Sequence, residues 1–260
     1  MKPKKFLGQN FLINEKIADQ IIEAADLSDK DTVLEIGPGT GILTERLVKV
    51  AGKVLAVEKD YDLVEKLRKS LNASSLKLIH QDALWFDLSL LEKYKVVANI
   101  PYNITSPLIR KFLENKPRPE LMIIMVQKEA AERITAKPGD SERGLLTLIV
   151  EFYARSEILF EVSRKEFFPS PAVDSAVIKI EPKKELSKIA PELFFQVVKA
   201  GFSSKRRQVH NSLAATLRLD KETTMKLLAD VKIDPMLRAE DLTLKQWEDL
   251  ADGYQKLITA

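Results

Sequence analysis

The sequence contains no cysteine and only two histidines, His80 and His210. Without cysteine the chain forms no disulfide, no thiolate zinc site and no cysteine nucleophile. Two histidines are too few for a histidine-rich metal site, so we predict no bound metal. No apolar run approaches the roughly 20 residues of a membrane span, and no long apolar segment follows the basic stretch Met1–Lys5. We therefore expect no membrane association and no secretory signal, and a cytoplasmic protein.

The chain also lacks a large excess of either charge. Its net charge is +3, from 41 basic and 38 acidic residues. This balance permits binding to nucleic acid without requiring it, so clustering of the positive charge becomes the relevant question. A length of 260 residues is enough for one large domain, or for a medium domain and a small one.

Short apolar segments alternate with amphipathic ones through the first half of the chain. This alternation predicts an α/β fold with a parallel sheet covered by helices on both faces. The predicted strands are 32–36, 53–57, 77–79, 96–98 and 121–126, and the predicted helices are 13–27, 42–50, 62–71, 107–113 and 128–134.

The pattern changes after about residue 144. A helix is predicted over 145–151, and the strands 154–162 and 176–180 follow with no long helix between them, which predicts an antiparallel hairpin at the sheet edge. Residues 191–260 carry helical periodicity alone. We place the boundary in the charged stretch Glu181–Pro191, giving an α/β domain of residues 1–184 and an all-helical domain of residues 185–260.

The tetrapeptide Asn99-Ile100-Pro101-Tyr102 follows the predicted strand 96–98. Ligands of open α/β sheets bind at the carboxyl ends of the strands. The Asn99 side-chain oxygen and the Pro101 carbonyl would together accept from the amine of a nucleobase and favour a pyramidal, nucleophilic nitrogen, while the Tyr102 ring would stack on the base. Taken alone, the tetrapeptide is better explained as a proline turn with an incidental tyrosine. Residues at the ends of neighbouring strands favour the ligand-binding interpretation instead.

The segment Glu35–Gly41 joins the first predicted strand to its helix and reads acid-x-Gly-x-Gly-x-Gly. Its glycines, Gly37 and Gly39 among them, let a ligand approach the backbone closely. The dinucleotide fingerprint requires glycine three positions after its second glycine, where this chain has Ile42. The phosphate-loop ending Gly-Lys-Ser/Thr is absent too. The remaining pattern suits S-adenosylmethionine, which carries no phosphate.

Two acidic residues stand at the ends of the next two strands. Glu58 lies 21 residues after Gly37, close to the usual offset of a ribose-binding carboxylate. Asp82 is placed to accept from the amine of an adenine. Taken individually, Glu58 is better explained as a solvated charge and Asp82 as a cap or turn residue. Together with the glycine loop they favour an S-adenosylmethionine site.

The chain carries five motifs in a fixed order: Gly8–Leu12, Glu35–Gly41, Gln81–Ala83, Asn99–Tyr102 and Phe167–Ser175. In this order they resemble the motifs of the KsgA-type small-subunit rRNA adenine dimethyltransferases, close relatives of the erythromycin-resistance rRNA methyltransferases. The resemblance implies a Rossmann-like, class I S-adenosylmethionine-dependent methyltransferase domain followed by a small helical domain.

The resemblance also implies individual roles. Tyr102 would stack on the target adenine and Phe167 would cover its other side. The adjacent Phe168 leaves open which ring stacks, although the alignment of the motif favours Phe167. The residues implied to line the cofactor pocket are Asn10, Leu12, Gly37, Glu58, Asp82 and Asn99.

A basic cluster, Lys205-Arg206-Arg207, is predicted at the start of a helix capped by Ser203 or Ser204. Cations at a helix start oppose the macrodipole, so contact with RNA phosphates is a reason to tolerate them there. The alternative is a solvated basic face. Lys2, Lys4, Lys5 and the stretch Lys116–Pro119 would extend the same surface.

The resemblance implies methylation of the N6 amines of two adjacent adenosines near the 3′ end of small-subunit (16S) rRNA, within an assembling 30S particle. We also expect the enzyme to be a monomer. The alternatives are a 23S rRNA methyltransferase of the macrolide-resistance type, a DNA adenine methyltransferase, and an rRNA-binding assembly factor. Pro107-Leu108 and the helical domain favour the small-subunit enzyme over the 23S type. The intact set of acceptors argues against a purely structural role.

Overall fold

The computed structural model describes residue 4 and residues 9–259. The chain divides into two compact units: residues 1–132 with Tyr153–Pro182, and Arg133–Phe152 with residues 183–260. The division after Pro182 lies inside the predicted boundary stretch. Residues 133–152 cluster with the C-terminal helices, whereas the sequence pattern groups them with the sheet.

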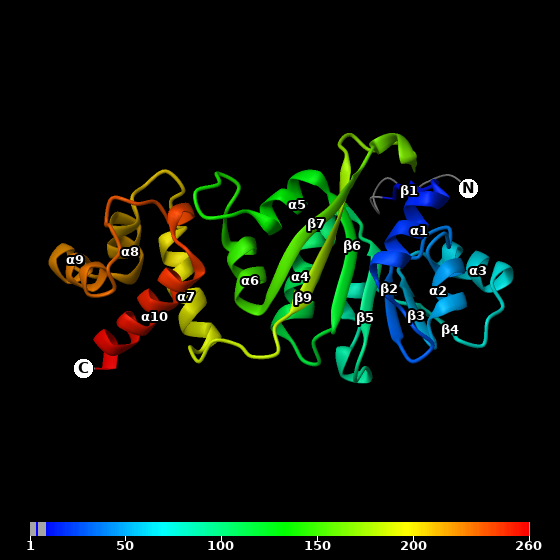
Figure 1. Cartoon of the computed structure of the whole chain (residues 1–260), viewed down its shortest axis with the longest axis horizontal. Helices are drawn as coiled ribbons and strands as arrows, with labels where there is room; N and C mark the ends of the chain where they lie inside the picture. The colour runs from blue at the N-terminus through cyan, green and yellow to red at the C-terminus, as the bar shows by residue number, and fades with distance from the viewer. Residues whose placement is uncertain (1–3, 5–8, 260) are drawn as a thin grey trace. The chain divides into compact units, whose positions relative to one another are not determined.

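The first unit is built on a seven-stranded sheet of order β4-β3-β2-β5-β6-β9-β7 (Figure 1). Strands β2 to β6 are parallel, and β9 pairs antiparallel with both β6 and β7, so the predicted antiparallel pairing at the edge is confirmed. The strands are β2 (Thr32–Ile36), β3 (Lys53–Glu58), β4 (Leu76–His80), β5 (Lys95–Asn99), β6 (Leu121–Gln127), β7 (Ala154–Val162) and β9 (Ser175–Pro182).

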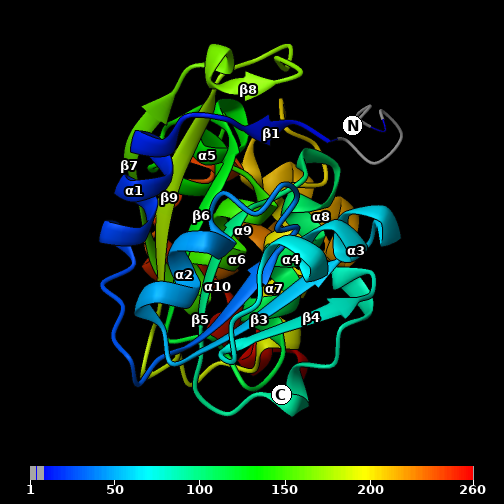
Figure 2. The same ribbon diagram turned by 90° about the vertical axis from the view of Figure 1, so that its right-hand side faces the viewer.

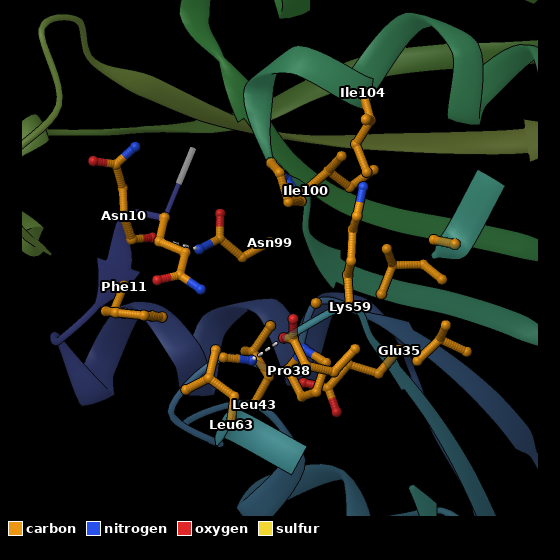
Figure 3. Close-up of a pocket in the computed structure, with 18 of the residues that line it drawn as sticks. Asn10, Phe11, Glu35, Pro38, Leu43, Lys59, Leu63, Asn99, Ile100 and Ile104 are labelled. Carbon is orange, nitrogen blue, oxygen red and sulfur yellow. Dashed lines mark hydrogen bonds between the residues drawn. The ribbon is translucent and has the colours of Figure 1, made fainter. Parts of the chain in front are cut away.

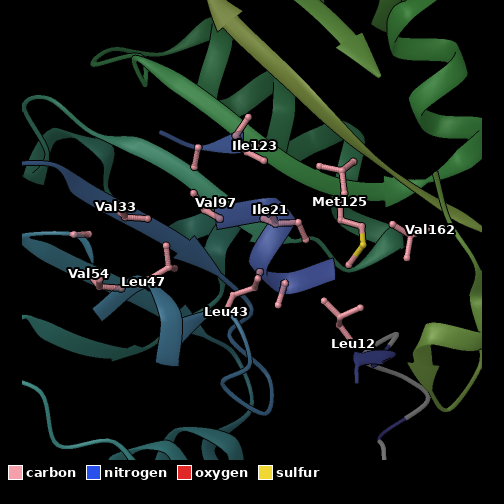
Figure 4. Packing of buried hydrophobic residues seen from close by; sticks show 14 of the residues in the cluster. Leu12, Ile21, Val33, Leu43, Leu47, Val54, Val97, Ile123, Met125 and Val162 are labelled. Carbon is pink, nitrogen blue, oxygen red and sulfur yellow. The ribbon is translucent and has the colours of Figure 1, made fainter. Parts of the chain in front are cut away.

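Both faces of the sheet are buried, as the continuous apolar strands predict. Val96 and Val97 on β5 are both fully buried, although successive side chains of a strand point to opposite faces. On one face, α1 and α2 pack into the cluster around Ile21, Leu47 and Val97 (Figure 4). The helices that connect the strands are α1 (Glu15–Ala24), α2 (Thr44–Val50), α3 (Tyr61–Ser70), α4 (Thr105–Glu114) and α5 (Lys128–Thr135), shown from the side in Figure 2.

A separate two-stranded sheet pairs β1 (Phe11–Leu12) with β8 (Phe167–Phe168). Leu12 lies opposite Phe167, and Phe11 lies opposite Phe168. This antiparallel pairing connects the segment before α1 with the segment before β9, which are far apart in the sequence. It fixes which of the two phenylalanines faces the core.

The second unit is helical in its described residues. The buried Trp247 packs against Gly201, where an added Cβ would lie 2.3 Å from the indole ring. The buried Arg143 donates to the carboxylate of Glu151 and to the Leu242 carbonyl, which ties residues 133–152 to the C-terminal segment. The helices are α6 (Leu145–Tyr153), α7 (Pro191–Gly201), α8 (Val209–Leu217), α9 (Lys221–Asp230) and α10 (Leu244–Thr259). None of the helices described is long and apolar enough to cross a membrane.

Candidate active site at the carboxyl edge of the sheet

One pocket opens at the carboxyl ends of β2, β3 and β5 (Figure 3). It contains every residue predicted to bind the cofactor or activate the amine, with the exception of Phe167. Those pocket residues are Asn10, Leu12, Gly37, Gly39, Glu58, Asp82, Asn99, Pro101 and Tyr102. Residues that are separate in the sequence are therefore neighbours in the fold.

The loop after β2 needs its glycines for two reasons. Gly37 and Gly39 adopt φ angles of +64° and +60°, in the left-handed region that favours glycine. A Cβ on Gly39 would also lie 3.1 Å from the ring of Phe11. The loop therefore presents bare backbone to the pocket and supports the N-terminal segment.

Glu58 at the end of β3 is 7% exposed, so it is not a solvated strand-end charge. Its carboxylate accepts from the Gly39 amide at 3.2 Å and from the Asp60 amide at 2.9 Å. Burial raises the pKa of Glu58, and these backbone hydrogen bonds oppose that shift. The carboxylate is thus held rigidly at the pocket wall.

Asp82 begins the short helix η2 (Ala83–Trp85) and accepts from the Leu84 amide at 2.9 Å. It also accepts from Lys59 Nζ at 2.9 Å. The hydrogen bond from Lys59 is the main reason that the pKa of Asp82 lies below its ordinary value. Asp82 is therefore a helix cap that also lines the pocket.

Glu35 also lines the pocket, although the sequence identifies it only as the acid of the glycine motif. It is 1% exposed, and its Oε2 atom has no hydrogen-bond partner. Burial, together with the nearby Glu58 carboxylate, raises the pKa of Glu35 to about 8. The sequence feature that indicates Glu35 as a pocket residue is its position at the start of the glycine loop.

The side chain of Asn99 is oriented by the N-terminal segment. Its Nδ2 atom donates to the main-chain carbonyl of Asn10 at 3.3 Å (Figure 3). This bond uses an amide hydrogen and leaves Oδ1 as the acceptor that the side chain presents to the pocket. Asn99 therefore presents a hydrogen-bond acceptor to the pocket, as the predicted contact with an amine requires.

Pro101 and Tyr102 form the turn that enters α4. The Pro101 carbonyl accepts from the Ile104 amide at 3.1 Å, which leaves one of its two lone pairs for a ligand. The Tyr102 hydroxyl lies 2.8 Å from Oγ of the buried Ser175. Burial raises the pKa of Tyr102, so the phenol is neutral over the physiological range.

The two phenylalanines of β8 have opposite environments. Phe167 is 3% exposed and belongs to the hydrophobic cluster that contains Leu12 and Val162. Phe168 is 59% exposed. Core packing therefore describes Phe167 and not Phe168. The β1–β8 pairing explains this arrangement, because Phe167 lies opposite Leu12, a residue of the core.

Lys205, Arg206 and Arg207 are all exposed and lie in the turn before α8, in the second unit. The prediction that a helix begins there with a serine cap is wrong. The helix begins at Val209, whose amide donates to the Leu237 carbonyl at 2.7 Å, and its N-cap residue Gln208 makes no side-chain capping bond. A β-bridge to Arg238 accompanies the extended conformation of Gln208 (φ −62°, ψ 148°), directly before the first residue of the helix.

Of the residues expected to extend this basic surface, Lys4 and Arg118 contact other side chains, and Lys116 is exposed. Lys4 pairs with Asp60 at 2.6 Å and with Asp62. The Arg118 guanidinium lies 4.7 Å from the centre of the Tyr153 ring. Lys2, Lys5 and Gly8 lie outside the described residues.

Within the described part of the chain, no group of three or more acidic or histidine side chains is arranged to hold a metal ion.

The comparisons with known sequences agree on one family. The profile of a family described as ribosomal RNA adenine dimethylase matches residues 1–256. The protein named ribosomal RNA small subunit methyltransferase A from Dehalococcoides mccartyi is 43% identical to this chain, over 98% of this chain and 89% of its own length. The protein of the same name from Fusobacterium nucleatum is 45% identical, over 98% of each chain.

Two solved structures share the fold over nearly the whole chain. A dimethyladenosine transferase from Plasmodium falciparum superposes with a TM-score of 0.84 at 28% identity, covering 95% of this chain and 98% of its own. The 23S rRNA methyltransferase ErmE superposes with a TM-score of 0.76 at 27% identity, covering 95% and 100%. Both similarities extend through the helical C-terminal part.

Proposed function

Because this chain belongs to the ribosomal RNA adenine dimethylase family, we propose that its pocket methylates the N6 amines of two adjacent adenosines near the 3′ end of small-subunit rRNA. S-adenosylmethionine is the methyl donor. The proposal rests on one observation: a single pocket is lined both by an acidic, glycine-rich set of residues and by the acceptors Asn99 and Pro101 beside Tyr102.

The donor set of the pocket fits S-adenosylmethionine. The cofactor offers ribose hydroxyls, an adenine amine and an ammonium group, all of which donate hydrogen bonds. Glu58 and Asp82 are acceptors at two points of the wall. Lys59 forms an ion pair with Asp82, so its positive charge is not available to bind a phosphate group. The bare backbone at Gly37 and Gly39 admits a close ligand.

Catalysis then depends on geometry. When bound, S-adenosylmethionine supplies an electrophilic methyl group on its sulfonium. Asn99 Oδ1 and the Pro101 carbonyl accept from the two hydrogens of the adenine amine, so that its lone pair points away from the ring system. Tyr102 holds the base by stacking, which is worth about 1–3 kcal/mol. Alignment of nitrogen and methyl accounts for most of the acceleration.

The target base must leave its stack to reach such a pocket. We propose that Phe168, rather than Phe167, contacts the extruded base or its neighbour, because its ring is exposed and Phe167 is part of the core. We further propose that Lys205, Arg206 and Arg207 contact RNA phosphates and that the enzyme acts as a monomer on an assembling 30S particle. The exposure of all three cationic side chains supports their role.

A 23S rRNA methyltransferase is the second candidate, because the ErmE structure shares the fold over 95% of this chain. Identities of 43% and 45% to proteins named for the small subunit favour the first candidate. Incubation with methyl-labelled cofactor and separated, unmethylated small- and large-subunit particles distinguishes them. We expect label in dimethyladenosine of the small-subunit rRNA. Label confined to the large-subunit rRNA would replace the proposal with its rival, and no label in either would reject both.

A further inference from the structure

A lysine on α4 holds the loop that forms one wall of the pocket. Lys111 Nζ lies 2.8 Å from the Leu84 carbonyl and 2.5 Å from the Phe86 carbonyl. These carbonyls belong to η2 and to the residue that ends it. The other end of the same loop is formed by Asp82 and Ala83, which line the pocket.

The two carbonyls need an external donor. A helix leaves its last carbonyls without partners in its own backbone, and η2 (Ala83–Trp85) has only three residues. An ammonium group meets this need with two charge-assisted hydrogen bonds, which are stronger than neutral ones. A cation at the C-terminal end of a helix also interacts favourably with its dipole.

The contact costs Lys111 part of its hydration. The side chain is half-buried, and burial lowers the pKa of Lys111, while the Asp87 and Asp82 carboxylates oppose that shift. A lysine that is fully exposed to solvent keeps its hydration. Lys111 therefore loses hydration energy when it contacts the loop, and the contact holds the loop in a defined position.

The helix that carries Lys111 also carries the acceptor side of the pocket. Tyr102 lies in η4 (Tyr102–Ile104), and α4 follows at Thr105 without a break. The ammonium of Lys111 thus connects the Asp82 side of the pocket to the element that positions Tyr102. All of these residues belong to the first unit.

We propose that Lys111 is a positioning residue: by holding the Leu84 and Phe86 carbonyls, it keeps Asp82 and Ala83 in place against the adenine of the methyl donor. This inference rests on the proposed function, because it takes S-adenosylmethionine as the ligand. Lys111 contacts neither reacting atom. Its loss should weaken recognition of the cofactor's adenine without slowing the transfer step.

The test compares Lys111→Met, which keeps the apolar stem, with Lys111→Arg, which keeps a cationic donor. Arg110→Met is the matched control on the same helix, because Arg110 pairs with Glu114 at the surface. Calorimetry measures affinity for S-adenosylhomocysteine and for its inosine analogue, which lacks the adenine amine. Single-turnover methylation at saturating cofactor measures the chemical step.

For Lys111→Met we expect about tenfold weaker binding of S-adenosylhomocysteine, the scale of hydrogen bonds to a charged group. The preference for the adenine form should shrink, the saturated rate should stay within about twofold, and Lys111→Arg should restore most of the affinity. An unchanged affinity and preference in Lys111→Met, with binding by the wild type intact, would overturn the role of Lys111 alone. Failure of the wild type to bind S-adenosylhomocysteine would instead overturn the proposed function.

Discussion

The hydroxyl groups of Tyr102 and Ser175 lie 2.8 Å apart, and Ser175 is fully buried on β9. The two residues come from two motifs that are 73 positions apart in the sequence. The contact joins the turn after β5 to a strand at the other side of β6. It restrains the tilt of the tyrosine ring on which we propose that the adenine stacks.

Ser175→Ala should therefore slow methyl transfer by roughly threefold to tenfold, the range of one neutral hydrogen bond. In a Tyr102→Phe background the same change should have almost no further effect, since the bond is already lost. Single-turnover rates of the four proteins provide this comparison. Fully multiplicative effects of the two substitutions would show that Ser175 acts independently of the ring.

Glu35 makes the stability of the cofactor-free protein depend on pH. The pKa of Glu35 is about 8 in the folded state and 4.5 ordinarily. The folded state therefore holds the proton more tightly, and the free energy of unfolding falls as pH rises from 4.5 through 8. Glu35→Gln removes this penalty. We expect its melting temperature to exceed that of the wild type by roughly 5 °C or more at pH 9, with the gap closing toward pH 5. A gap that is constant with pH would contradict the raised pKa.

The two phenylalanines of β8 should respond differently to truncation. Phe167→Ala should cost about 3–5 kcal/mol of stability because it opens a cavity in the core. Phe168→Ala should leave thermal stability nearly unchanged and weaken RNA binding by about 1–3 kcal/mol, the scale of base stacking.

The same pair tests dimethylation. After the first transfer the amine keeps one hydrogen, so the base depends more on stacking in the second step. Monomethyladenosine should accumulate with Phe168→Ala, as followed by mass spectrometry of digested RNA. Accumulation with Phe167→Ala alone, in protein that remains folded, would return the stacking role to Phe167.

Replacement of Lys205, Arg206 and Arg207 by alanine should weaken RNA binding and flatten its salt dependence. Loss of three phosphate contacts reduces the slope of log K against log[salt] by roughly 2–3 units. Replacement of Lys221, Lys226 and Lys232 in the same unit is the charge-matched control. A salt slope that is equal in both triple variants would leave the cluster as a solvated surface.

Local patterns were sufficient to predict most of the sheet. Continuous apolar segments marked β5 and β6, and the glycine pattern marked the turn after β2. The pocket followed from the rule that parallel strands end at one edge, which brought Glu58, Asp82 and Asn99 together. These inferences rely on periodicity and chain order, which a sequence displays directly.

Pairings between distant segments were outside the reach of that reasoning. The β1–β8 pairing has only two residues in each strand, and it determines that Phe167 faces the core. The bridge from Gln208 to Arg238 delays the start of α8. The bond from Arg143 to the Leu242 carbonyl attaches residues 133–152 to the C-terminal helices. Each depends on a partner whose identity no local pattern reveals.

The central claim is that Asn99 activates the adenine amine by presenting Oδ1. Single-turnover methylation of unmethylated small-subunit particles by Asn99→Ala, at saturating S-adenosylmethionine and enzyme, tests it most directly. We predict a rate at least ~100-fold below that of the wild type, the scale of losing one preorganised hydrogen-bond group in a transition state. RNA affinity, measured on the same protein, should stay within about twofold. A rate near that of the wild type would contradict the account.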